Sequence, residues 1–281
     1  MPHPLLSIVI PTHKRPEILR RTLEHIERQT IADKIEVIVV NDGEELKMKN
    51  EKRKMIVKFF DIPKCHQGVA RNKGVSEASG KYVLFIGDDI FLAPDACEKH
   101  IFHFSLFTVH SAILGFTTWD PSCVITPVMR WLESSGWQFG YSQLRPFAHL
   151  PISPSLQHRF TYTSHISLPT EIAKKLPFRE DVTLYGWEDI EWGLRLKNAD
   201  IPLIYEPDAK AFHHHHMELE DSLRRMETLG KSAVIMEKLV PELKLVPKGW
   251  KKMKYRIASL LPGLRGQHAG AFLRGLHEGV R

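Results

Sequence analysis

Two adjacent acids, Asp88 and Asp89, lie within the otherwise apolar stretch FIGDDIFL (85–92). Burying an unpaired carboxylate is costly, and two neighbouring carboxylates repel each other. Carboxylate oxygens are preferred ligands of Mg²⁺ and Mn²⁺, and a bound cation would compensate this charge. The alternative is that one of the two acids caps a following helix, because aspartate is a favoured N-cap residue.

A second pair of acids, Glu188 and Asp189, occurs in GWEDIEW (186–192), at the expected start of a helix. The N-terminus of a helix stabilises an anionic side chain. A carboxylate held there could act as a general base toward a hydroxyl group. The alternative is that the pair only caps the helix.

Four consecutive histidines, His213 to His216, follow a predicted strand. Side chains alternate between faces along a strand, so His213 and His215 share one face and His214 and His216 the other. An imidazole could complete a metal shell begun by Asp89. The alternatives are an exposed polar run and a separate zinc site, although no cysteines stand at metal-binding spacing.

Arg71 lies near the N-terminal end of the helix predicted over residues 66–80. Its guanidinium could contact a base or a phosphate. The alternative is an ordinary solvated arginine on a helix surface.

The first 106 residues predict alternating strands and helices. Strands are indicated at 5–13, 35–42, 55–61 and 81–89, and helices at 16–30, 66–80 and 93–106. Such strands, with few polar positions, indicate an α/β fold with a parallel sheet covered on both faces. Ligands bind beyond the carboxyl ends of these strands, so we expect Thr12, Asp42 and Asp88 to meet at the rim of one crevice.

The second half of the chain is less regular. Residues 117–165 show weak periodicity, which predicts functional loops. Helices are expected at 168–178, with Thr170 as N-cap, at 186–200 and at 218–240, and one or two strands within 201–216. Three cysteines without CxxC spacing favour a reducing, cytoplasmic setting over a disulfide framework. The N-terminus shows no secretory signal, and we find no apolar run of membrane-spanning length.

The positive charge is concentrated at the C-terminus. Residues 248–281 contain eight lysines and arginines and one acid, a net charge of +7 in a chain of +6, so the first 247 residues carry −1. This distribution argues against a nucleic-acid-binding protein. The basic segment also contains aromatic and aliphatic residues, and could rest on an anionic membrane surface. The alternative is a solvated, partly helical extension.

Taken in order, IVIPTHKR, IVVNDG, GVARNKGVSEASGKYVLFIGDD, GWEDIEWGLRL and PDAKAFHHH resemble the family 2 glycosyltransferases, across residues 5–217. The resemblance implies the GT-A fold, with a mostly parallel central sheet flanked by helices. It implies a catalytic domain over residues 1–220, with a nucleotide-binding half at about 1–105 and an acceptor-binding half at about 106–220. Residues 221–281 would form a helical, basic C-terminal extension.

By matching position, the resemblance also implies residue roles. The nucleotide-binding residues would be Pro11, Thr12, Arg15, Asp42, Arg71 and Asp88, the metal ligands Asp89 and His213 with His215 as the alternative, and the catalytic residues Asp189 as general base and Glu188 as acceptor contact. The cofactor would be Mn²⁺ or Mg²⁺. Two positions depart from the family: Gly87, where many members have a third acid, and His165, where asparagine is common.

The predicted function is therefore inverting transfer of a sugar from a nucleotide donor, most simply a UDP-sugar, to a hydroxyl of a carbohydrate, lipid-linked or protein acceptor. The predicted location is the cytoplasm, with peripheral contact at the inner face of the membrane through the basic C-terminal segment. One alternative is a non-catalytic nucleotide-sugar-binding or scaffold subunit of a glycan assembly system. A nucleotidyltransferase is disfavoured, because PTHKRPE (11–17) is not the glycine-rich loop that such enzymes use.

Overall fold

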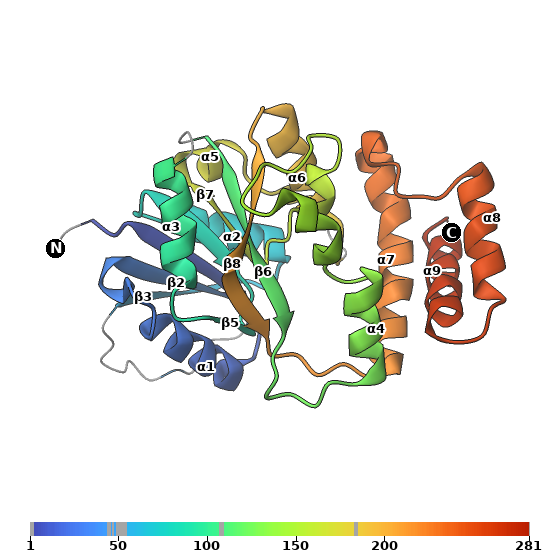
Figure 1. Ribbon diagram of the computed structural model, residues 1–281, viewed down its shortest axis with the longest axis horizontal. Helices are drawn as coiled ribbons and strands as arrows, with labels where there is room; N and C mark the ends of the chain where they lie inside the picture. Colours follow the sequence, from blue (N-terminus) through green and yellow to red (C-terminus); the bar gives the residue numbers. More distant parts are fainter. Residues whose placement is uncertain are drawn as a thin grey trace.

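The computed structural model describes residues 3–43, 46, 48, 55–106, 110–182 and 185–280. Its centre is an eight-stranded sheet of order β3-β2-β1-β4-β7-β6-β8-β5 (Figure 1). The strands are β1 (Leu6–Thr12), β2 (Ile35–Asp42), β3 (Ile56–Ile62), β4 (Tyr82–Ile86), β5 (Ile90–Leu92), β6 (Ala112–Trp119), β7 (His165–Pro169) and β8 (Leu203–His213).

The described residues also form helices. They are α1 (Pro16–Glu27), α2 (Gln67–Ser76), α3 (Ala96–Leu106), α4 (Pro127–Ser135), α5 (Thr170–Lys175), α6 (Glu188–Asn198), α7 (Leu219–Leu239), α8 (Gly249–Ser259) and α9 (Leu264–Val280), with short 3₁₀ turns η1 (Ala32–Lys34), η2 (Tyr141–Phe147), η3 (Gln157–Phe160) and η4 (Pro241–Leu243). None of the helices, within the residues described, is long and apolar enough to cross a bilayer.

The sheet is mostly parallel, as predicted. Strands β3, β2, β1 and β4 are parallel neighbours, and β6 is parallel to β8. Strand β7 runs antiparallel between β4 and β6, and β5 is antiparallel to β8. The apolar side chains of β1 alternate between two cores, with Ile8 and Ile10 on one face and Val9 on the other. Burial on both faces explains why the strands read as continuous apolar runs.

The strand expected over 81–89 ends earlier, at Ile86. A turn at 87–89 follows, and the short strand β5 then pairs with the end of β8. Helix α3 therefore starts at Ala96, beyond β5. The alternative that Asp88 or Asp89 caps this helix is wrong, because a strand separates them from it.

The stretch 117–165 is more ordered than its weak periodicity predicted. Helix α4 begins after Thr126, whose hydroxyl oxygen accepts a hydrogen bond from the Met129 amide at 3.3 Å. The predicted N-cap at Thr170 is wrong: Thr170 is the first residue of α5, and its hydroxyl donates to the Gly80 carbonyl at 2.7 Å. That hydroxyl ties α5 to the loop before β4 instead of capping its own helix.

The C-terminal helices pack together beside the sheet (Figure 1). A Cβ atom added at Gly230 of α7 would lie 2.3 Å from the Phe272 carbonyl oxygen, and one added at Gly275 of α9 would lie 1.9 Å from the Glu227 carbonyl oxygen. The two helices therefore approach backbone to backbone, which only glycine permits. A solvated extension is the wrong description of α9, whereas α8 contains no buried residue. Arg281, counted in the basic segment, lies outside the described residues.

Candidate active site

A cavity of about 1030 Å³ opens at the carboxyl ends of β1, β2 and β4, and the N-terminus of α6 and one face of α7 also line it. The residues assigned to nucleotide binding, metal binding and catalysis all line this cavity: Pro11, Thr12, Arg15, Asp42, Arg71, Asp88, Asp89, Glu188, Asp189, His213 and His215. The expected convergence of strand ends in one crevice is confirmed.

Asp88 is buried on the side of the acidic turn that faces β1. Its carboxylate accepts hydrogen bonds from the Thr12 hydroxyl at 2.7 Å and from Arg15 at 2.8 Å. The Thr22 hydroxyl of α1 donates to its backbone carbonyl at 2.6 Å. Burial and the adjacent Asp89 charge raise the pKa of Asp88 to about 6, although Arg15 opposes the shift. The turn is therefore held from both β1 and α1.

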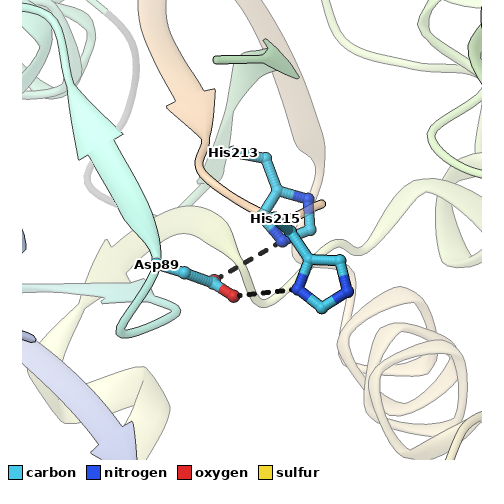
Figure 2. A group of neighbouring side chains, drawn as sticks. All are labelled: Asp89, His213 and His215. Carbon is cyan, nitrogen blue, oxygen red and sulfur yellow. Dashed lines mark ion pairs between the residues drawn. The ribbon is translucent and has the colours of Figure 1, made fainter. Parts of the chain in front are cut away.

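Asp89 faces two histidines from the end of β8 (Figure 2). Its carboxylate oxygens lie 3.5 Å from His213 Nε2 and 3.5 Å from His215 Nδ1, and Arg15 Nη2 lies 2.8 Å away. Burial alone would raise the pKa of Asp89, but the two imidazoles and Arg15 hold it well below its usual range. The β5–β8 pairing creates this cluster, because it places Ile90 opposite His213.

His213 and His215 face the same side, as predicted, although strand β8 ends at His213. His213 stacks on Trp119, with ring centroids 5.3 Å apart, and on His215 at 5.2 Å. His214 points away and contacts Asp120 at 2.6 Å. His216 is exposed and contacts the Glu218 carboxylate. Only the first and third histidines therefore face the acidic turn.

The donor set of Asp89, His213 and His215 fits a divalent transition-metal ion. One nitrogen or oxygen atom from each residue lies within 4.8 Å of the others. Mg²⁺ prefers oxygen ligands, whereas imidazole nitrogens suit transition metals. Gly87 belongs to this arrangement, because a Cβ atom there would lie 3.0 Å from Asp89 Oδ1. A side chain at position 87 would therefore press on the Asp89 carboxylate, which also faces the two histidines.

The loop before α6 holds Asp189 at the cavity edge. Gly186 and Trp187 both have positive φ angles, 96° and 72°. The Trp187 indole donates to the Leu229 carbonyl of α7 at 3.0 Å, and a Cβ atom at Gly186 would lie 2.3 Å from Leu229 Cδ2. Helix α7 therefore supports the loop that leads into Glu188 and Asp189, the first residues of α6.

Two carboxylates, of Asp189 and Glu188, lie close to the Arg71 guanidinium at this edge of the cavity. Burial and the Glu188 carboxylate raise the pKa of Asp189, and Arg71 opposes the shift. Arg71 Nη1 lies 3.9 Å from Glu188 Oε1. Arg71 Nε and Glu188 Oε2 have no hydrogen-bond partner among the described residues. Buried polar atoms without partners are costly, so these two are suited to a polar ligand.

The alternative of a solvated Arg71 is wrong. Arg71 is buried, its Nη2 donates to Gln67 at 2.9 Å, and its guanidinium lies 5.3 Å from the Phe178 ring centre.

Asp42, at the end of β2, contacts His13 through its carboxylate at 3.0 Å and remains partly exposed to the cavity.

Sequence reasoning missed part of the cavity wall and misplaced one residue. The residues missed are aromatic residues before β7 and a polar face of α7: Phe139, Tyr162, Asp221, Arg225 and Thr228. The three α7 residues are spaced one helical turn apart, and this spacing could have indicated that they share one polar face of the helix. His165 was expected to alter sugar or acceptor contacts, but it is fully buried, lies outside the cavity lining and pairs with His100 at 3.1 Å.

Comparison with solved structures identifies the class of fold. The mannosyltransferase PcManGT of Pyrobaculum calidifontis, solved with GDP-Man and Mn²⁺, aligns over 98% of this chain and 75% of its own, with a TM-score of 0.59 and 16% identity. S. aureus TarS 1-349, solved with UDP, aligns over 82% of this chain and 65% of its own, with a TM-score of 0.57 and 16% identity. The protein thus has the GT-A fold of nucleotide-sugar transferases.

Comparison of sequences assigns the protein to a family within this fold. Residues 7–146 match the glycosyl transferase family 2 model. The validoxylamine A glucosyltransferase of Streptomyces hygroscopicus subsp. jinggangensis is 28% identical over 224 residues, 71% of this chain and 53% of that protein. The chain belongs to glycosyl transferase family 2. It covers about half or less of the length of the first relatives it matches.

Proposed function

We propose that this protein is an inverting glycosyltransferase that uses a nucleotide-diphosphate sugar and a divalent cation. One observation supports the proposal: a single cavity contains both a buried acid of raised pKa, Asp189, and a set of side chains suited to hold a cation, Asp89, His213 and His215. A titratable side chain whose pKa is shifted by its surroundings, in a cavity with other charged groups, is typical of an acid–base site. The family membership supports this assignment.

The nucleotide would occupy the half of the cavity lined by β1, β2 and α2. Pro11 and Thr12 would border it, and Asp42 would accept a hydrogen bond from an N–H of the base, which suits uracil. Arg71, with its unpartnered Nε, would contact the nucleotide. Arg15 would place positive charge beside the diphosphate, supported by Asp88. A UDP-sugar is therefore the donor we propose.

Asp89, His213 and His215 would hold the cation, and Mn²⁺ suits their mixed nitrogen and oxygen donors better than Mg²⁺ does. A bound Mn²⁺ would stabilise the negative charge of the departing diphosphate. The ion pairs of Arg15 with both carboxylates of the turn would position its guanidinium near the same charge. Trp119 limits the motion of the His213 ring by stacking on it.

Asp189 would accept the proton of the acceptor hydroxyl as that oxygen attacks the anomeric carbon from the side opposite the diphosphate. A single displacement of this kind inverts the configuration. Its raised pKa makes Asp189 a stronger base than an ordinary carboxylate, which favours proton transfer near neutral pH. Glu188 would orient the acceptor, with Phe139 and Tyr162 offering aromatic surface on which a sugar ring can pack.

A thermal-shift screen of UDP-, GDP- and dTDP-sugars, each with and without Mn²⁺, tests this assignment. A ligand that binds only the folded state raises the melting temperature. We expect UDP-sugars to give the largest rise and to require Mn²⁺ for most of it. A matched Asp42→Asn protein should lose the preference for uracil nucleotides. Equal shifts for all three bases would contradict the role of Asp42.

Helix α8 supports a second proposal, that the protein rests peripherally on an anionic membrane at the cytoplasmic face. Exposed apolar residues repeat along one side of the helix and its end: Trp250, Met253, Ile257, Leu260 and Leu261. Exposed lysines flank them, at positions 251, 252 and 254. An amphipathic, basic helix of this composition suits the interface of anionic lipids. The location would bring the cavity close to a lipid-linked acceptor.

Vesicle sedimentation tests the membrane proposal. Truncation before α8 is unsuitable, because it would also remove α9, which packs on the helix that lines the cavity. We expect wild type to bind vesicles containing phosphatidylglycerol, and Leu260→Ser combined with Lys251→Glu and Lys254→Glu to reduce binding at least about tenfold. Leu106→Ser is the matched control, since Leu106 is 59% exposed and Leu260 is 85% exposed. Equal binding by all proteins would contradict the proposal.

A further inference from the structure

A second group of metal-ligating side chains lies on the other part of β8. It comprises His103 of α3, His149 after η2, and Glu206 of β8. The partners of Glu206 and His213 on the neighbouring strand β6 are Gly115 and Trp119, which are four residues apart along β6. At the rise of a strand, the backbones of Glu206 and His213 are therefore about 13 Å apart. None of the three residues lines the cavity.

The three side chains converge on one point. His103 Nε2 and His149 Nδ1 both contact Glu206 Oε2, the second at 3.2 Å. One ligand atom from each residue lies within 4.8 Å of the others. Ligands about 2.1 Å from a tetrahedral Zn²⁺ ion lie about 3.4 Å from one another, so small side-chain rotations would place the three ligand atoms around one ion. Glu206 and His103 are both buried, and His149 forms the exposed side.

Neighbouring groups orient these ligands as the surroundings of metal sites do. The Asp208 amide donates to the second oxygen of Glu206 at 2.7 Å, which leaves Oε2 for the imidazoles. The Asp208 carboxylate lies 3.9 Å from His149 Nε2, the ring nitrogen that does not face Glu206. Carboxylates commonly hydrogen-bond the outer nitrogen of a metal-bound histidine, and a small side-chain rotation would bring Asp208 to that distance.

The backbone departs from regular geometry at two places in the cluster. Strand β8 bulges between Glu206 and Lys210, where its register against β6 shifts. His149 has a φ of 60°, in the left-handed region that is uncommon for residues other than glycine. Its amide donates to the Tyr205 carbonyl at 2.8 Å, which fixes that conformation. Bulges and left-handed residues concentrate at functional sites, where the surrounding structure maintains them.

We propose that His103, His149 and Glu206 bind a Zn²⁺ ion that is distinct from the cation of the cavity. Two imidazoles and one carboxylate form a familiar zinc donor set, and such a set disfavours Mg²⁺ and Ca²⁺. The ion would join α3, β8 and the segment after η2. That segment belongs to the stretch between α4 and β7 that supplies Phe139 and Tyr162 to the cavity. The site would stabilise the cavity wall, and it does not depend on the proposed reaction.

Zinc titration of the EDTA-treated full-length protein tests the site. An Asp89→Asn background weakens zinc binding in the cavity and serves as the parent. We expect His149→Ala to lose one equivalent of bound Zn²⁺ relative to this parent in isothermal titration, or to bind it at least about tenfold more weakly. His277→Ala is the matched control, because His277 is exposed on α9, far along the chain from the cluster. It should retain the parent stoichiometry.

Glu206→Gln provides a second variant, which preserves the shape of the side chain and removes its charge. Zn²⁺ should raise the melting temperature of the parent and of His277→Ala, and raise that of His149→Ala and Glu206→Gln much less. The comparison with the parent excludes zinc held by Asp120, Cys123 and His214, since that group is unchanged in every protein. Unchanged stoichiometry and affinity in His149→Ala would overturn the proposal and leave an ion-paired cluster without metal.

Discussion

Asp189→Asn should reduce sugar transfer by about 10²–10⁴-fold, the contribution that a general base usually makes. Asparagine preserves the size of the side chain and cannot accept the acceptor proton. Donor affinity should change little, because the proposed nucleotide contacts are made by β1, β2 and α2. Transfer is measured as release of nucleoside diphosphate, and affinity by titration of the donor with Mn²⁺ present. The distinctive result is a loss of turnover with binding retained.

Asp200→Asn is the matched control for this prediction. Asp200 follows α6, is exposed and has a φ of 55°, a conformation that asparagine adopts readily. It should retain the wild-type rate.

The dependence of the wild-type rate on pH is a second test, because a purely structural role of Asp189 would not produce it. The pKa of Asp189 is raised to about 7, and only its anion accepts a proton, so the wild-type rate should fall as pH decreases through about 7. Normal turnover by Asp189→Asn would contradict the base assignment.

Removing the cation, or either of two ligands, should nearly abolish transfer. EDTA, Asp89→Asn and His213→Ala should each reduce the rate by at least about a hundredfold, because charge on the leaving diphosphate would then be poorly stabilised. Added Mn²⁺ should restore the wild-type protein after EDTA treatment, and should restore the two variants only partly. Initial rates across a range of Mn²⁺ concentrations measure the effect.

His216→Ala is the control matched to His213→Ala, since both residues belong to one histidine run and only His213 faces Asp89. Its rate and its Mn²⁺ dependence should match those of the wild type. If His216→Ala and His213→Ala behaved alike, the ligand assignment would be wrong. If EDTA had no effect on wild type, the requirement for a cation would be contradicted.

The convergence of the strand ends could be predicted from the sequence, because parallel strands bring their carboxyl ends to one edge. Thr12, Asp42 and Asp88 each follow an apolar run, and each lines the cavity. That His213 and His215 face the same side could also be predicted from strand alternation, although β8 itself ends at His213. These are local rules, and they placed the first part of the site correctly.

The rest depended on pairings between distant segments, which a single sequence does not specify. His213 meets Asp89 because β5, a strand of three residues, pairs with the end of β8. The burial of His165 likewise depends on its neighbour in β6. A Cβ atom at Gly115 would lie 2.3 Å from the His165 ring, so the glycine makes room for the imidazole. Neither partner is apparent in the local pattern.

The contribution of α7 to the site was missed for the same reason. Its amphipathic pattern indicates a helix with a buried face, and does not indicate which element that face meets. In the structure, Gly230 allows close contact with α9, and Leu229 supports the Gly186–Trp187 loop. Whether the domain ends near residue 220 stays a prediction, but α7 contributes side chains to the cavity from beyond that boundary.

Release of nucleoside diphosphate from a panel of UDP-, GDP- and dTDP-sugars, with Mn²⁺ or with EDTA, tests the central claim most directly. It distinguishes a transferase from a subunit that only binds the donor, because a non-catalytic protein would bind without releasing product. We predict release from at least one UDP-sugar in Mn²⁺, its loss in EDTA, and its loss in Asp189→Asn. The absence of release from every donor that binds, or equal release with and without the cation, would contradict the account.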